Sequence, residues 1–180
     1  MGSIFIVSTI LLWILVLLNL LLTFGIVRRV NLRSSNVPQW DDELLEAGAT
    51  APDFTVDTLS GESVSLAEYE GFRRILIFLS VGCTPCVEAL PKIKDIALRI
   101  ESSDGVLALI FSQSVEDVMS FADDHHLKLP IWTVPPSSSF WQDYNVTGTP
   151  SFCVIDPQNK VVSSGFLGGV EWENILDIDR

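Results

Sequence analysis

The chain has 180 residues, of which 48% are hydrophobic, and its formal net charge is −12 at pH 7. This length allows one folded domain and an additional segment. The excess of acidic residues argues against binding of the folded part to nucleic acid or to an anionic membrane surface. Three cysteines are too few to form a disulfide-rich scaffold.

The N-terminal segment, residues 1–27, is predicted to be a transmembrane anchor. Residues 4–27 contain no charged side chain, and a helix of this length spans the roughly 30 Å hydrocarbon core of a bilayer with some tilt. A cleaved signal peptide fits less well, because no basic residue precedes the long apolar run and no small-residue cleavage site follows it. Residues 28–48 are predicted to be a juxtamembrane linker.

The remaining residues, 49–180, are predicted to form one domain of strands and helices. Apolar runs and turn residues predict strands at 54–56, 63–66, 74–80, 106–111, 129–132, 151–155 and 161–165. Helical periodicity predicts helices at 67–70, 87–100, 115–124, 139–144 and 170–178. Ser114 is the predicted N-cap of the third of these helices, with Asp117 as its acidic partner. This order predicts an α/β fold in which helices flank a mixed central sheet.

Two cysteines stand at a predicted strand-to-helix junction, in the run Cys83-Thr84-Pro85-Cys86. Unpaired N–H groups and the helix dipole at such a junction lower the pKa of a thiol from about 8.5 into the range of about 3.5–7.5. Pro85 suits a first helical turn, because its missing N–H would have no partner there. Thr84 can place a hydroxyl near the thiolate. The motif predicts thiol–disulfide exchange through a Cys83–Cys86 disulfide, with no other cofactor and no metal.

Together with a downstream Gly-Thr-Pro element, this motif resembles the thioredoxin superfamily, and most closely its membrane-tethered, extracytoplasmic TlpA-type branch. The likeness covers residues 49–178. It rests on three segments: Ala51-Pro52-Asp53-Phe54, Cys83-Thr84-Pro85-Cys86 and Val146-Thr147-Gly148-Thr149-Pro150. The layout is also similar to the MauD-like accessory proteins of methylamine dehydrogenase maturation, which begin with an uncharged apolar helix closed by arginines. The resemblance implies a thioredoxin fold with an N-terminal β-hairpin extension.

The resemblance also implies roles for individual residues. Cys83 would be the nucleophile and Cys86 the thiol that resolves the mixed disulfide. A cis peptide bond between Thr149 and Pro150 would pack against the cysteine pair and leave the backbone of Thr149 free to bind an extended client segment. An ordinary loop proline would be the preferred interpretation of Pro150 if the cysteine motif were absent.

Two positions depart from the thioredoxin pattern. Gly82 precedes the first cysteine, where thioredoxins usually have tryptophan. Ile77 aligns with a buried acid that assists proton transfer to the second cysteine in thioredoxins. We therefore expect proton handling to differ, through water, Glu88 or another acid.

The resemblance implies a membrane-tethered oxidoreductase that acts on a client protein with cysteines and is supplied with electrons by an upstream thiol protein. Its Cys-x-Pro-Cys pattern favours a reductase or isomerase, and the tether favours maturation of an extracytoplasmic client. Arg28, Arg29 and Arg33 follow the predicted span, so the positive-inside rule places the domain in the cytoplasm. The family resemblance places it outside, where disulfides persist. We expect the extracytoplasmic side and leave the cytoplasmic side open.

Other interpretations use the same residues. A peroxiredoxin-like peroxidase would explain Ser80, three residues before Cys83, but Leu76 stands where its proline is expected. A copper-delivery factor would need a Cys-x-x-x-Cys loop and a suitably placed histidine. A zinc site needs four ligands, and His125-His126 fits a solvated helix end better. Cys153 lies in an apolar run and is interpreted as a small buried hydrophobe, with a third redox thiol as the alternative.

Overall fold

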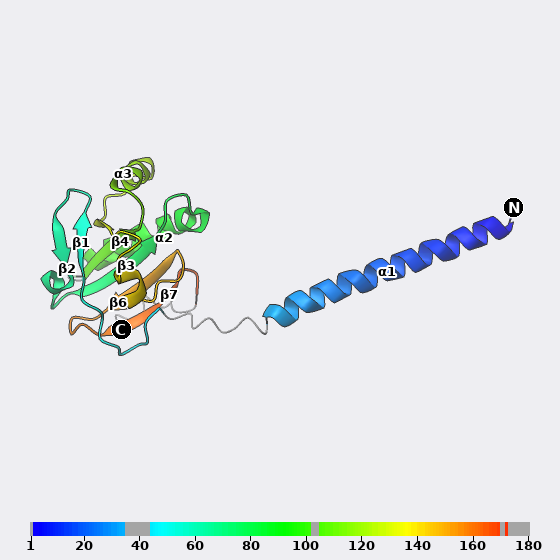
Figure 1. Ribbon diagram of the computed structural model, residues 1–180, viewed down its shortest axis with the longest axis horizontal. Helices are drawn as coiled ribbons and strands as arrows, with labels where there is room; N and C mark the ends of the chain where they lie inside the picture. Colours follow the sequence, from blue (N-terminus) through cyan, green and yellow to red (C-terminus); the bar gives the residue numbers. More distant parts are fainter. Residues whose placement is uncertain (1, 35–43, 102–104, 170–171, 173–180) are drawn as a thin grey trace. The chain divides into compact units, whose positions relative to one another are not determined.

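The computed structural model describes residues 2–34, 44–101, 105–169 and 172, and the chain divides into two compact units, Met1–Trp40 and Asp41–Arg180. The first unit contains one continuous helix, α1 (Gly2–Ser34), drawn in blue in Figure 1. Large apolar side chains of this helix between Ile6 and Leu21 are exposed. Within the described ranges, no helix meets the length and apolar character required of a membrane span. The transmembrane helix predicted at residues 4–27 is thus not confirmed.

The second unit is built on a mixed sheet of seven strands in the order β2-β1-β5-β4-β3-β6-β7. The strands are β1 (Thr55–Thr58), β2 (Ser63–Ser65), β3 (Arg73–Leu79), β4 (Gly105–Phe111), β5 (Ile131–Thr133), β6 (Ser151–Ile155) and β7 (Val161–Phe166). The helices are η1 (Leu66–Tyr69, a 3₁₀ turn), α2 (Thr84–Glu101), α3 (Val115–Asp124) and α4 (Phe140–Asp143). The predicted mixed α/β fold is confirmed.

The strand directions explain why the sheet is mixed. The three central strands β3, β4 and β5 run parallel, because helices α2 and α3 provide the crossovers between them. The outer pairs are antiparallel: β1 forms the N-terminal hairpin with β2, and β6 and β7 pair beside β3. The hairpin adds to the sheet through β5.

Predicted and observed elements agree closely, with one instructive shift. Helix α2 begins at Thr84, three residues before the predicted start, because a proline in the first turn does not interrupt helical bonding. The helix predicted at 170–178 lies outside the described residues, except for Trp172, which packs on Phe152 with ring centroids 5.4 Å apart.

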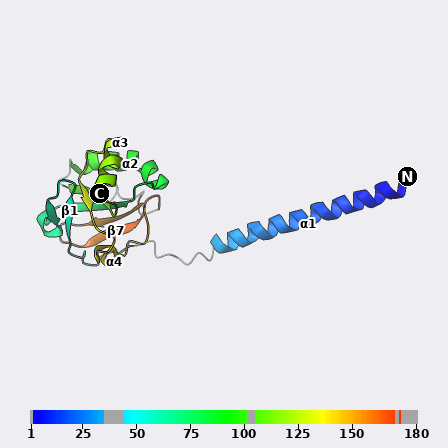
Figure 2. The same ribbon diagram turned by 45° about the horizontal axis from the view of Figure 1, so that its top comes forward.

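The sheet carries a hydrophobic core on each face. Along β3, Ile75, Ile77 and Leu79 pack in the cluster that includes α2 and α3, whereas Leu76 and Phe78 pack in the cluster that includes α4. Figure 2 shows these helices on opposite sides of the sheet. Complete burial of such a side chain contributes about 1.5–3 kcal/mol, so this central strand is a main source of stability.

The N-terminal part of the folded unit is held on the second face by an aromatic cluster. The ring of Phe54 packs edge-on against Phe140, with centroids 5.4 Å apart, and the hydroxyl of Tyr144 donates to the carbonyl of Pro52 over 2.8 Å. Leu44, within the predicted linker, is also buried here. The packed unit therefore begins before the predicted domain start at residue 49.

A buried arginine organises the end of the sheet opposite the carboxyl end of β3. Arg74 is 1% exposed, and its guanidinium donates to the side chain of Asn159 and to the carbonyl of Asp156. Both acceptors lie in the turn between β6 and β7. This charge is therefore used to fix a turn far from the cysteine pair.

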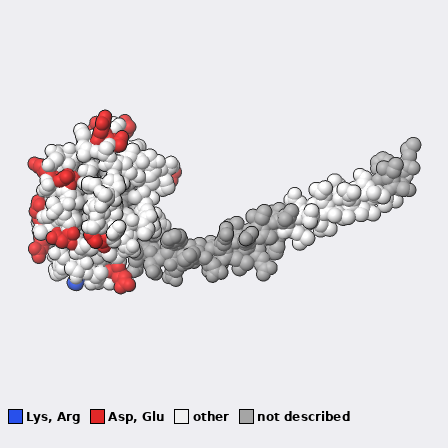
Figure 3. Space-filling model, in the orientation of Figure 1, with Lys and Arg blue, Asp and Glu red and all other residues white. Residues whose placement is uncertain are grey.

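Acidic side chains are spread over the face of the folded unit that Figure 3 shows, and basic side chains are scarce there. The acidic side chains are not concentrated on one helix or strand, although α3 carries several: Glu116, Asp117, Asp123 and Asp124. Such a distribution keeps a protein soluble and disfavours polyanionic partners.

Helix α3 provides a direct test of the predicted cap. Ser114 accepts a hydrogen bond from the backbone N–H of Asp117 over 3.2 Å and donates one to its carboxylate over 2.6 Å. We expect Ser114→Ala to lower the free energy of unfolding by about 1 kcal/mol, measured by urea titration. The matched control is Ser120→Ala, the same change at an exposed interior position of α3, where alanine is the better helix former. Equal losses in the two variants would contradict this account of the cap.

Candidate active site

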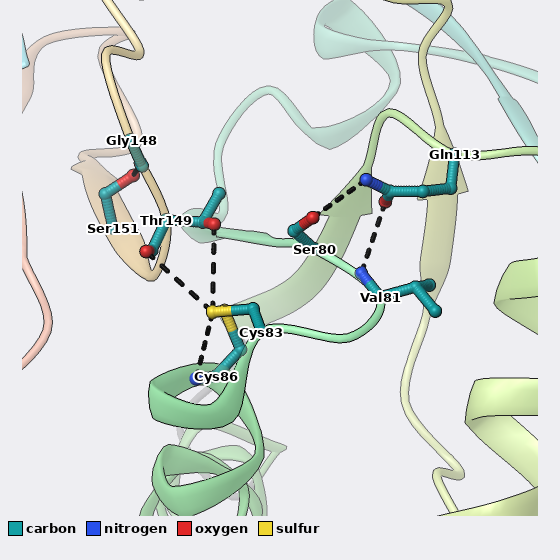
Figure 4. The surroundings of a disulfide bond; sticks show 8 residues. All are labelled: Ser80, Val81, Cys83, Cys86, Gln113, Gly148, Thr149 and Ser151. Carbon is teal, nitrogen blue, oxygen red and sulfur yellow. Dashed lines mark hydrogen bonds between the residues drawn. A yellow bond between two sulfur atoms is a disulfide. The ribbon is translucent and has the colours of Figure 1, made fainter.

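Sheet pairing brings two segments that are distant in sequence to the segment that carries the first cysteine. Strands β3 and β4 are parallel and end together, with Leu79 opposite Phe111, so the residues that follow both strands share one edge. Strand β6 is antiparallel to β3, with Ser151 opposite Phe78, so the residues that precede β6 reach the same edge. Figure 4 shows these segments gathered around the disulfide.

Cys83 and Cys86 form a disulfide with a Cα–Cα distance of 5.2 Å. Their surroundings differ. Cys83 is half-buried, whereas Cys86 is completely buried in the apolar cluster that contains Ile77 and Ile93. Of the two sulfur atoms, only that of Cys83 lies in a partly exposed residue that an incoming sulfur can approach.

Cys83 occupies the N-cap position of α2, immediately before Thr84. The backbone N–H of Cys86, in the third helical residue, donates to the sulfur of Cys83 over 3.2 Å. This is the geometry in which serine or aspartate caps a helix, with sulfur in place of oxygen. The positive end of the helix dipole acts on the same atom, so a thiolate at Cys83 would be stabilised once the disulfide is reduced. Thr84 and Pro85 are exposed beside it.

Thr149 approaches the sulfur of Cys83 from the loop before β6. Its carbonyl oxygen and its hydroxyl oxygen each lie 3.9 Å from that sulfur. The Thr149–Pro150 peptide bond is cis, as the resemblance implies. In the oxidised protein the sulfur has no proton to donate, whereas in the reduced protein the hydroxyl can donate to a thiolate. All six residues predicted for the site therefore lie at one edge of the sheet.

The two departures from the thioredoxin pattern have a structural context. Gly82 has a φ of +78°, a left-handed conformation that a tryptophan would adopt only with strain. Ile77 is completely buried in the same cluster as Cys86, so this position supplies apolar contacts and no proton. Glu88 is exposed on α2.

A cavity of about 270 Å³ opens beside Thr149. Its walls combine hydroxyl groups with apolar surface: Ser80, Ser112, Pro136, Trp141, Val146, Thr147, Gly148 and Thr149. A second cavity, of about 320 Å³, shares Ser112 and Pro136 with the first and extends to Asp57. The two therefore form adjoining hollows along the edge of the sheet that carries the disulfide.

Sequence reasoning missed one contact near the disulfide. The side-chain amide of Gln113, two residues after β4, donates to the hydroxyl of Ser80 over 2.8 Å. Its oxygen accepts the backbone N–H of Val81 over 3.4 Å. The sequence does contain a signal for this contact, since Gln113 follows a predicted strand next to the one that leads to Cys83.

The remaining cysteine and histidines lie elsewhere. Cys153 is completely buried in the cluster on the opposite face of the sheet from Cys86, and burial raises the pKa of its thiol to about 12. His125 ends α3 with its ring 4.5 Å from that of Phe121, and His126 is exposed. In the part of the chain that the structure describes, no three His, Cys, Asp or Glu residues group to hold a metal ion.

Comparisons with known proteins give a family match and several related proteins. The chain matches the AhpC/TSA family over residues 47–164. It is 30% identical to the thioredoxin-like protein YneN of Bacillus subtilis, over 75% of this chain and 81% of that protein. It is 26% identical to the thiol-disulfide oxidoreductase ResA of Bacillus thuringiensis, over 67% of this chain and 70% of ResA. It is 28% identical to the methylamine utilization protein MauD of Paracoccus denitrificans, over 100% of this chain and 91% of MauD.

A solved structure supports the fold. The thioredoxin domain of a thiol-disulfide oxidoreductase from Bacteroides vulgatus superimposes with a TM-score of 0.68 at 21% identity, covering 75% of this chain and 98% of that domain. The thioredoxin fold expected from the sequence is therefore confirmed.

Burial of Cys153 predicts a thiol that reagents reach only after unfolding. In the Cys83→Ser/Cys86→Ser variant, which leaves Cys153 as the remaining thiol, we expect no alkylation by N-ethylmaleimide at pH 8 and complete alkylation in urea, measured by mass spectrometry. Because burial raises the pKa of this thiol to about 12, the unfolded chain loses the thiol proton first, and stability should fall as pH rises from the ordinary thiol pKa toward 12. Cys153→Ala should remove that part of the pH dependence. Rapid labelling of the folded variant would place Cys153 at the surface instead.

Proposed function

The chain belongs to the AhpC/TSA family, and on that premise we propose that it is a thiol–disulfide oxidoreductase acting on protein cysteines through Cys83 and Cys86. The observation that carries this proposal is the disulfide at the N-terminus of α2, with one half-buried and one completely buried sulfur. Similarity to the thiol-disulfide oxidoreductase ResA over 67% of this chain supports the same activity.

The reaction in the reducing direction moves two electrons to the client. The Cys83 thiolate attacks one sulfur of a client disulfide, a Cys83–client bond forms, and the other client sulfur leaves as a thiolate. Cys86 then loses its proton and attacks the sulfur of Cys83, which releases the second client thiolate and forms the Cys83–Cys86 disulfide. An upstream thiol protein restores the reduced pair by the reverse exchange.

The difference in burial supports Cys83 as the attacking thiol and Cys86 as the resolving thiol. A thiolate at Cys83 accepts the N–H of Cys86 and lies at the positive end of α2, whereas a thiolate at Cys86 would be surrounded by apolar side chains. Charge therefore belongs on Cys83 in the resting reduced state. Cys86 gains access to the sulfur of Cys83 without moving to the surface, since the two Cα atoms are only 5.2 Å apart.

The adjoining hollows beside Thr149 suit an extended segment of the client. Their hydroxyl groups can bind backbone amides, and Trp141 and Val146 offer apolar contact to a side chain next to the client cysteine. The formal net charge of −12 favours a client that is not itself strongly acidic.

The first prediction for this activity separates the two cysteines. We expect the rate of insulin disulfide reduction by the Cys83→Ser variant to fall to the uncatalysed rate, because no thiolate remains to attack the insulin disulfide. Cys86→Ser should accumulate mixed disulfides with client proteins, visible on non-reducing gels, because the resolving thiol is gone. Cys153→Ala is the matched control and should retain activity. Undiminished reduction by the Cys83→Ser protein would sink the proposal.

A peroxidase reaction is the second candidate, favoured by Ser80, which stands three residues before Cys83. The hydroxyl of Ser80, however, already accepts a hydrogen bond from Gln113. The peroxidase would be favoured if the reduced protein consumed hydrogen peroxide faster than it reduced the disulfides of insulin.

We further propose that residues 4–27 anchor the chain in a membrane, with the folded unit on the extracytoplasmic side, where it matures a client protein. The absence of charge in this segment and the exposed apolar side chains of α1 support the anchor. Similarity to MauD along the full chain supports a shared layout.

Both parts of this proposal are testable in cells. We expect the protein to remain in the membrane pellet after carbonate extraction, and a variant lacking residues 1–27 to be soluble. A membrane-impermeant thiol reagent should label reduced Cys83 in intact cells whose outer barriers are open. Labelling that requires lysis of the inner membrane would place the domain in the cytoplasm, in accord with the arginines.

A further inference from the structure

The turn that presents Cys83 combines hydrogen bonds with partial packing, since Val81 and Cys83 lie against the apolar cluster that contains Ile77. The backbone N–H of Cys83 donates to the carbonyl of Ser80 over 3.3 Å, which closes a four-residue turn. Gly82 in this turn has a φ of +78°, and apart from Gly82 and its two chain neighbours no heavy atom lies within 4 Å of the position that a Cβ would take. Because glycine in open space is conformationally free, additional contacts help this turn to keep one geometry.

Gln113 supplies two such contacts from the segment that follows the neighbouring strand β4. Its amide NH₂ donates to the side chain of Ser80, and its amide oxygen accepts the backbone N–H of Val81, so the first two residues of the turn are bound by one side chain (Figure 4). An amide has a donor and an acceptor side by side, as these two contacts require. A flipped amide would set NH₂ against the N–H of Val81 and lose the second bond.

The position of Gln113 connects its hydrogen bonds with Ser80 and Val81 to the buried sheet. It stands two residues beyond Phe111, the last residue of β4, and Phe111 pairs with Leu79 at the end of β3. The amide therefore joins the ends of two adjacent parallel strands of the buried sheet. Gln113 is half-buried, which reduces competition from water.

We propose that Gln113 is a positioning residue for Cys83. By fixing Ser80 and Val81, it fixes the turn that places the sulfur of Cys83 against the N–H of Cys86 and beside Thr149, and thereby sets the reactivity of the Cys83 thiolate. This proposal rests on the proposed function, since it assigns Gln113 a role in the reactivity of the same cysteine.

The test measures the rate of iodoacetamide alkylation of Cys83 in the reduced full-length protein as a function of pH. Loss of the amide in Gln113→Leu loosens the turn, so the N–H contact to the sulfur weakens and less thiolate is present near neutral pH. We expect the rate at pH 7 to fall about three- to tenfold, as for loss of one or two hydrogen bonds. At pH 10, where the thiol is ionised in both proteins, the rates should agree within about twofold.

Two further variants keep the test decisive. Ser80→Ala removes one hydrogen-bond partner of the Gln113 amide and leaves Gln113 in place, so it should give part of the same fall in the alkylation rate at pH 7. In the double variant the two losses in rate should be less than additive. Gln158→Ala, at an exposed site in the turn at the opposite end of the sheet, is the matched control and should leave the profile unchanged.

The outcomes separate this proposal from the proposed function. A Gln113→Leu profile that superimposes on that of the unmodified protein overturns the positioning role, and so does full additivity with Ser80→Ala or an equal loss at pH 7 and pH 10. Retention of disulfide exchange by Cys83→Ser would instead overturn the function, whatever the alkylation profiles show.

Discussion

The burial of β3 on both faces is the constraint on which the site depends. Its side chains alternate between two cores, so a shift of one residue would move every one of them to the wrong face. With β3 fixed, its parallel pairing with β4 and antiparallel pairing with β6 determine which residues meet at its carboxyl end. The site is thus assembled by sheet register, and the loops that carry it are short.

Electrostatics at the cysteine pair follow from an asymmetry of environment rather than from a buried acid. Ile77 belongs to the same apolar cluster as Cys86, and these apolar surroundings disfavour negative charge on Cys86. The N–H donor and the helix dipole act on Cys83 instead. The two thiols therefore differ in how readily they ionise, although no ionisable side chain stands at position 77. The proton of Cys86 must leave by a route that does not use this position.

Local signals in the sequence predicted much of this structure. The Ser114 cap and the strand at 151–155 were each predicted from residue type and spacing, because they depend on neighbours in the chain. The cis bond before Pro150 was expected only from the family resemblance. The contact of Gln113 with Ser80 spans 33 residues and depends on where two parallel strands end. Burial of Leu44 depends likewise on tertiary packing, since nothing next to it in sequence marks it as core.

The cysteines of the redox pair are only three residues apart, and this has a consequence for the whole molecule. A cross-link stabilises a protein chiefly by restricting the unfolded chain, and the effect grows with the length of the loop that it closes. A bridge this short restricts little, so the native state gains little from its presence. The thermodynamic stability of the protein therefore rests on the two hydrophobic cores, and the exchange proposed for this bridge would leave that stability nearly unchanged.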